Sequence, residues 1–178
     1  MLNLYLGKNQ AEVKIFKFPA GESGASFTSP LTGSYVEPLA GCITLKWEGN
    51  EDLINLALLV DAVRRQHPQV ELSLNIPYFP YARQDRVCNK GESLSLKVIA
   101  SLINSIHFAR VYVLDPHSEV LGAVLNNMVA LDITSKIAKV VLILDGVELV
   151  SPDAGANKKV MSYAKDLDGL SVIRADKT

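Results

Sequence analysis

The stretch that decides the fold is Asn75-Ile76-Pro77-Tyr78-Phe79-Pro80-Tyr81-Ala82-Arg83-Gln84-Asp85-Arg86. It follows an apolar run of strand length, residues 70–76, and precedes residues 94–106, whose apolar side chains recur at helical spacing. A polar loop between a strand and a helix lies at the carboxyl end of the strand, where open α/β sheets bind ligands. Two prolines stiffen the loop, and Arg83 and Arg86 carry planar guanidinium groups suited to phosphate. The stretch predicts a phosphate-binding loop or, in a simpler interpretation, a rigid crossover loop whose charges pair with one another.

Length and composition are those of an ordinary globular protein. The 178 residues are 48% hydrophobic and 21% charged, and the net charge of −1 gives no reason to expect nucleic acid or an anionic membrane as a partner. The two cysteines, Cys42 and Cys88, are too few for a disulfide framework. Residues 1–6 lack the features of a signal peptide, and residues 53–63 are too short and too charged to span a bilayer. We expect a cytoplasmic protein.

Sequence periodicity predicts strands and helices along the whole chain. We expect strands at residues 2–6, 12–18, 42–47, 70–76, 110–114, 147–150 and 171–174, and helices at 51–65, 94–106, 121–127 and 157–167. Residues 23–41 are expected to form loop with at most one short strand, and the type of 133–140 stays open. Asn50 is expected to cap the helix that follows it. Because strands alternate with helices from residue 42 onward, the sequence predicts an α/β domain with a mainly parallel sheet and an antiparallel edge at the amino terminus.

Two further polar clusters follow predicted strands. Asp115, His117 and Glu119 come directly after one strand, and carboxylate and imidazole groups suit Mg²⁺ or Mn²⁺. Asp153 and Gly155 follow another, where helix amides could face an anion. A lone histidine or a Pro-Asp turn is also common for purely structural reasons. The sequence has no P-loop, no dinucleotide-binding glycine fingerprint and no His-Glu-x-x-His zinc motif.

The loop at 76–86 closely resembles the signature loop of the ribose-phosphate pyrophosphokinases, the phosphoribosyl pyrophosphate synthetases, with Pro80 as the one mismatch. Residues 18–22, 115–119 and 151–156 resemble other segments of that family, although Ala20, Pro116 and Ala156 depart from its pattern. The resemblance implies a phosphoribosyltransferase-like three-layer α/β domain with a mainly parallel central sheet. It also implies transfer of a diphosphoryl group from ATP to ribose 5-phosphate, with Mg²⁺ as cofactor.

The resemblance assigns roles to particular residues. ATP would be held by Arg83, Gln84, Asp85 and Arg86. Phe18 and Glu22 would reach the adenine of a neighbouring subunit, although a plain Pro-Gly turn also explains their segment. Mg²⁺ would be placed by Asp115, His117 and Asp153, and Lys177 would be the catalytic cation.

Residues 1–178 are expected to be a single amino-terminal, ATP-side domain of a two-domain enzyme, because the family's loop for ribose 5-phosphate is absent from them. We expect a homo-oligomer, at least a dimer, with no nucleic-acid or membrane partner. Two alternatives stay open. One is a non-catalytic regulatory or oligomerisation relative of the family, and the other is a phosphoribosyltransferase that consumes phosphoribosyl pyrophosphate.

Overall fold

The computed structural model describes residues 1–31, 39–144 and 146–175, and the chain divides into two compact units. Unit 1 is Met1–Leu131 and unit 2 is Asp132–Thr178. Within the described ranges, no helix has both the length and the apolar character needed to cross a membrane.

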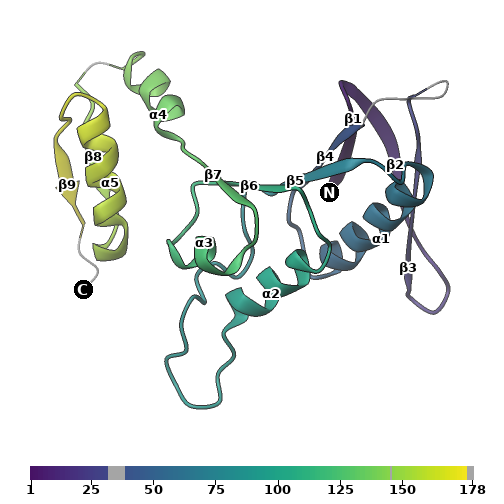
Figure 1. Cartoon of the computed structure of the whole chain (residues 1–178). Coiled ribbons are helices and arrows are strands. Elements are labelled where there is room, and N and C mark those ends of the chain that lie inside the picture. The colour runs from purple at the N-terminus through teal and green to yellow at the C-terminus, as the bar shows by residue number, and fades with distance from the viewer. Residues whose placement is uncertain (32–38, 145, 176–178) are drawn as a thin grey trace. The chain divides into compact units, whose positions relative to one another are not determined.

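Unit 1 is built on a seven-stranded sheet of order β3-β2-β1-β4-β5-β6-β7 (Figure 1). Its strands are β1 Leu2–Leu6, β2 Asn9–Lys17, β3 Ser23–Thr28, β4 Ala40–Leu45, β5 Glu71–Asn75, β6 Arg110–Leu114 and β7 Met128–Leu131. The pairs from β4 to β7 are parallel, while β1 pairs antiparallel with both β2 and β4, and β2 antiparallel with β3. The predicted α/β class, with a mostly parallel central sheet and an antiparallel amino-terminal edge, is confirmed.

Three helices of unit 1 lie on one face of this sheet (Figure 1). They are α1 Glu51–Gln66, α2 Ser95–Asn104 and α3 Val120–Val124. The parallel strands follow one another in sequence order, so right-handed crossovers put every connecting helix on the same face. Unit 1 therefore contributes the sheet and one helical layer of the expected three-layer arrangement.

The core of unit 1 lies between the sheet and these helices. Alternate residues of β4 and β5, such as Ile43 and Leu74, are fully buried, whereas their neighbours Thr44 and Asn75 are half-buried on the other face. This alternation is the pattern of a sheet covered on one face. Helix α1 packs a stripe that includes Leu59, which is 0% exposed, and burial of such a side chain stabilises the fold by about 1.5–3 kcal/mol.

The start of α1 differs from the sequence prediction. Asn50 occupies the cap position, but its backbone is helical and its side chain does not cap the helix. Asp52 instead accepts hydrogen bonds from the backbone amides of Glu48 (2.7 Å) and Gly49 (3.1 Å). The carboxylate therefore closes the turn before the helix, and the Asn50 amide is left for another contact.

Two other elements also depart from expectation. Strand β7 was not predicted, because it has only four residues and is half-exposed, and the adjoining α3 ends at Val124 rather than at residue 127. A residue that precedes proline is biased towards extended backbone, but Asp115, which precedes Pro116, has a φ of 47°, in the left-handed region. The Asp115 amide donates to the carbonyl of Leu131 at 2.9 Å, which ties this turn to the end of β7.

Unit 2, taken by itself, contains α4 Thr134–Val141 and a β-α-β segment. That segment is formed by β8 Leu149–Ser151, α5 Ala154–Asp166 and β9 Val172–Arg174, with β8 and β9 parallel. Residues 133–140, whose type was left open, are thus largely helical. Helix α5 begins three residues before the predicted start, because Asp153 caps it.

Candidate functional site: a polar loop at the end of strand β5

The loop between β5 and α2 fixes its backbone with apolar side chains and exposes its polar ones. Ile76, Phe79 and Ala82 are 0%, 3% and 6% exposed, so they are anchored in the core of unit 1. Arg83 and Gln84 are exposed. The loop therefore presents polar groups on a backbone that is anchored by buried apolar side chains.

Local hydrogen bonds shape the turn that carries Arg83. Tyr81 has a φ of 59°, and its carbonyl accepts from the amide of Gln84 at 3.0 Å. The Gln84 carbonyl in turn accepts from the amide of Leu96 in the first turn of α2, at 3.3 Å. Arg83 thus lies in a closed turn that is joined to the helix that follows it.

Arg83, Gln84 and Arg86 line a shallow depression of about 570 Å³. The other residues that line it, which the sequence analysis did not single out, are Cys88, Glu92, Ser93 and Ser95. The side-chain amide of Asn89 donates to Glu92, and so do the backbone amides of Asn89 and Cys88, both at 3.0 Å. These hydrogen bonds, that of the Asn89 side chain above all, lower the pKa of the Glu92 carboxyl. Since Glu92 is engaged in closing its own turn, Arg83 and Arg86 supply the positive charge that suits an anionic ligand here. The hydroxyls of Ser93 and Ser95 lie beside them and are hydrogen-bonded to each other at 2.8 Å.

The Asn89-x-x-Glu92 spacing was the available signal for this turn. A glutamate three residues after an asparagine is the spacing of a capping interaction, and here it closes a loop rather than a helix.

Asp85 lies in the same loop but its side chain is only 11% exposed. The hydroxyl of Ser118 is the main cause that lowers the pKa of the Asp85 carboxyl, with a smaller contribution from Arg86, whose Nε is 3.4 Å from Oδ1. The Ser118 hydroxyl is buried and has no hydrogen bond of standard geometry within the described part of the chain, so the contact is a loose one. Ser118 belongs to the loop after β6, and the two predicted site loops therefore meet at Asp85.

The loop after β6 carries two of the predicted metal ligands. Asp115 is half-buried and His117 is exposed. Across residues 1–31, 39–144 and 146–175, no group of three His, Cys, Asp or Glu side chains is close enough to hold a metal ion. Asp153, the third predicted ligand, belongs to unit 2, so the three-residue set stays a prediction.

Asp153 has a defined structural role in unit 2. Its Oδ1 accepts from the amide of Ala156 at 2.9 Å, which makes it the N-cap of α5. A Cβ on Gly155 would lie 3.3 Å from that oxygen, so glycine here gives room to the capping carboxylate. The sequence analysis suggested that the backbone amides at the start of this helix could face an anion. In the structure, one of them, that of Ala156, is bonded to the capping carboxylate instead. Lys177 lies outside the described residues.

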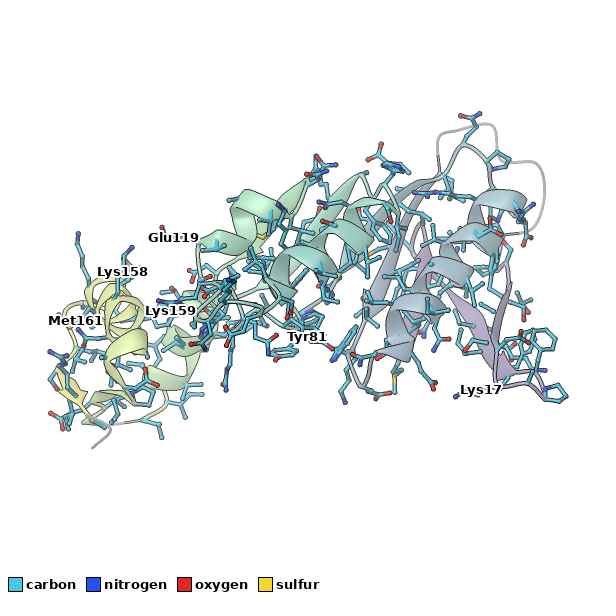
Figure 2. All side chains as sticks on the ribbon, turned by 90° about the horizontal axis from the view of Figure 1, so that it is seen from below. Lys17, Tyr81, Glu119, Lys158, Lys159 and Met161 are labelled. Carbon is cyan, nitrogen blue, oxygen red and sulfur yellow. The ribbon has the colours of Figure 1, made fainter. Side chains whose placement is uncertain are left out.

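Phe18 and Glu22 close the turn between β2 and β3. The Phe18 amide donates to the Glu22 carbonyl at 2.8 Å, and the Phe18 ring is 50% exposed, edge-on to Phe16. Strand β2 runs in the same direction as β4, so this turn lies at the same edge of the sheet as the two site loops. The ion pair of Lys17 with Glu51, at the start of α1, agrees with this placement. Figure 2 shows Lys17, Tyr81 and Glu119 at separate places along unit 1.

Comparison with known proteins identifies the same family that the loop at 76–86 resembles. Residues 2–106 match the family model described as the N-terminal domain of ribose phosphate pyrophosphokinase. The chain belongs to this family.

Curated relatives match over nearly the whole chain. A ribose-phosphate pyrophosphokinase of Aquifex aeolicus is 30% identical over 95% of this chain and 55% of its own length. Ribose-phosphate pyrophosphokinase 1 of rice, a chloroplastic protein, is 30% identical over 97% of the chain and 44% of its own length. The chain thus spans about half the length of these relatives.

A solved structure shows the same fold. The crystal structure of phosphoribosylpyrophosphate synthetase from Mycobacterium smegmatis matches with a TM-score of 0.74, covering 94% of this chain and 56% of that one at 19% identity. This match confirms the fold, while the family model and the curated relatives confirm the family that the loop at 76–86 resembles.

Proposed function

We propose that this chain is the ATP-binding half of a ribose-phosphate diphosphokinase. In the reaction, the 1-hydroxyl oxygen of ribose 5-phosphate bonds to the β-phosphorus of ATP. The bond from that phosphorus to the oxygen that bridges it to the α-phosphate breaks, AMP leaves, and the hydroxyl proton passes to solvent. The observation that carries the proposal is the turn of Arg83 and Gln84, exposed at the lip of a depression at the carboxyl end of β5.

Phosphoryl transfer depends mainly on positioning and charge neutralisation, and the loop offers both. Arg83 and Arg86 supply forked donors for phosphate oxygens, and Gln84 supplies a neutral amide beside them. Asp85 belongs to the same proposed site, although its carboxylate is turned towards Ser118. Lys177 is proposed as the cation that stabilises the transferred phosphates, and Phe18 and Glu22 as adenine contacts between subunits.

Asp115, His117 and Asp153 are proposed to place Mg²⁺, directly or through its water molecules. Their carboxylate and imidazole donors suit the ion, and Asp153 keeps one carboxylate oxygen outside its helix-capping bond. Bound Mg²⁺ would neutralise charge on the phosphate oxygens. In this proposal, His117→Ala changes the Mg²⁺ concentration needed for ATP binding and leaves the melting temperature unchanged, because the imidazole is exposed.

The reaction itself can be tested with the purified 178-residue chain. We expect Mg²⁺-dependent binding of ATP by calorimetry and no release of AMP on addition of ribose 5-phosphate, since the chain spans about half of its relatives. Release of AMP that depends on ribose 5-phosphate would contradict the statement that this chain supplies only the ATP-binding half. Failure to bind ATP would contradict the proposal as a whole.

A second candidate is a regulatory or oligomerisation relative that has lost turnover. The observation in its favour is the turn at Pro116, where Asp115 has the left-handed φ of 47° rather than the extended backbone expected before proline. A chain that assembles into oligomers but binds no ATP would favour this candidate.

A further inference from the structure

Tyr81 holds a backbone conformation that its own side chain disfavours. Its φ is 59°, in the region where the Cβ of an L-residue crowds the backbone. A non-glycine residue persists there only when surrounding contacts hold it, and such positions cluster at functional sites. The contacts that hold Tyr81 should therefore matter for the loop.

Two side chains of the segment between β4 and α1 hold it. The Tyr81 hydroxyl donates to Asn50 Oδ1 at 2.7 Å. The rings of Tyr81 and Trp47 meet edge to face, with centroids 6.5 Å apart. Because β4 and β5 are neighbours in the sheet, these contacts fasten the loop to the end of the adjacent strand.

Asn50 is free for this contact because Asp52 closes the turn before the helix. A residue of the favoured capping type stands at the cap position, yet its side chain makes no capping bond. The Asn50 amide oxygen instead accepts the hydrogen bond from Tyr81, which lies 31 residues away in sequence, after the neighbouring strand β5.

The main chain of Tyr81 passes this restraint on to Arg83 and Gln84. Its carbonyl accepts the Gln84 amide and so closes the turn that presents Arg83. We propose that Tyr81 is a positioning residue, held by Asn50 and Trp47, which fixes the direction of Arg83 and Gln84 towards a nucleotide phosphate. The ligand in this statement rests on the proposed function, whereas the ordering of the loop does not.

Tryptic cleavage tests the ordering of the loop without any ligand. Trypsin cuts after Arg83 and Arg86 in this loop and after Lys8 in the β1–β2 turn, and mass spectrometry measures each rate. Loss of one hydrogen bond allows local opening about five times as often, so Tyr81→Phe and Asn50→Ala should raise cleavage in the loop about fivefold and leave cleavage at Lys8 unchanged. Tyr78→Phe is the matched control, because it removes a hydroxyl from a side chain of the same loop that is 61% exposed.

Calorimetric titration with Mg²⁺ and ATP tests the effect on the ligand. Tyr81→Phe should weaken ATP binding about fivefold, and Asn50→Ala should weaken it about equally. The double variant should weaken it no further, because both substitutions remove the same hydrogen bond. Asn50→Asp keeps an acceptor oxygen and should restore the affinity of the unaltered chain.

Each outcome decides the proposal. Loop cleavage that is unchanged, or that rises equally at Lys8, overturns it, as does selective loop cleavage with unaltered ATP affinity. If the unaltered chain binds no ATP while loop cleavage rises selectively, the proposed function fails and the restraint of Arg83 by Tyr81 stands.

Discussion

Arg83 and Asp85 are two positions apart in the loop, yet their side chains have different surroundings. The Arg83 guanidinium is exposed at the depression, while the Asp85 carboxylate is 11% exposed and lies against Ser118 of the next loop. The family resemblance implies that both contact ATP, because a sequence shows which polar groups lie in a loop but not which way each side chain faces. Contact with a residue 33 positions away (118 − 85) is set by the pairing of β5 with β6.

The pKa of Asp85 gives a prediction at this scale. Since its pKa is lowered on folding, the carboxylate stabilises the fold above its ordinary pKa of 3.8, and this contribution is lost as the pH falls through the folded value. Carbon-detected NMR titration should place the pKa of Asp85 below 3.8, and Ser118→Ala should raise it. An Asp85 pKa at or above the ordinary value in the unaltered chain would show that the two loops do not meet there.

At the scale of elements, β4 is the strand at which the antiparallel edge joins the parallel sheet. It passes between β1 and β5, and Gly41 lies where side chains from both neighbours converge. A Cβ there would lie 2.7 Å from Leu72 Cδ2 and 3.2 Å from Leu6 Cδ2, both in the buried core. Glycine is required at this position by close packing rather than by backbone conformation.

Gly41→Ala should therefore destabilise unit 1 by about 1–3 kcal/mol through overpacking. Gly49→Ala is the matched control, since no atom lies within 4 Å of its added Cβ, and its effect should stay within about 0.5 kcal/mol. Urea unfolding at constant m-value measures both. Equal effects of the two substitutions would mean that the core around Gly41 can relax.

Elements with strong periodicity were predictable from the sequence, and those held by tertiary contacts were not. Strand β6 coincides with the predicted residues 110–114, because buried and half-buried residues alternate along it. Strand β7 has four residues and is specified mainly by pairing with β6, which no local pattern records. Asn50 has the residue type of a cap, but the competing contact with Tyr81 could only be seen in the folded chain.

At the scale of the whole molecule, the residues proposed to contact ATP and Mg²⁺ are found in both units. Arg83, Gln84, Asp85 and Arg86, with Asp115 and His117, belong to unit 1, whereas Asp153 belongs to unit 2. The β2–β3 turn region of unit 1 also exposes Phe16 and Phe18, which are 36% and 50% exposed. Exposed aromatic side chains that lie together favour association with another surface.

We predict that the chain forms at least a dimer. Sedimentation equilibrium should give at least twice the monomer mass of 19.4 kDa, and Phe16→Ser with Phe18→Ser should shift the population towards monomer. Ile54→Ser, on the outer face of α1 where the side chain is 60% exposed, is the control. A single 19.4 kDa species at high concentration would contradict the prediction.

The measurement that tests the central claim most directly is the affinity of the chain for ATP with Arg83 replaced. Arg83→Ala removes a charge-assisted contact worth about 1.5–3 kcal/mol, so calorimetry should show ATP binding weakened roughly ten- to a hundredfold at an unchanged melting temperature. Arg65→Ala, which removes an exposed arginine paired with Asp61 on α1, should leave the affinity unaltered. An Arg83→Ala chain that binds ATP as tightly as the unaltered chain, with a lowered melting temperature, would show that Arg83 supports the loop and does not bind phosphate.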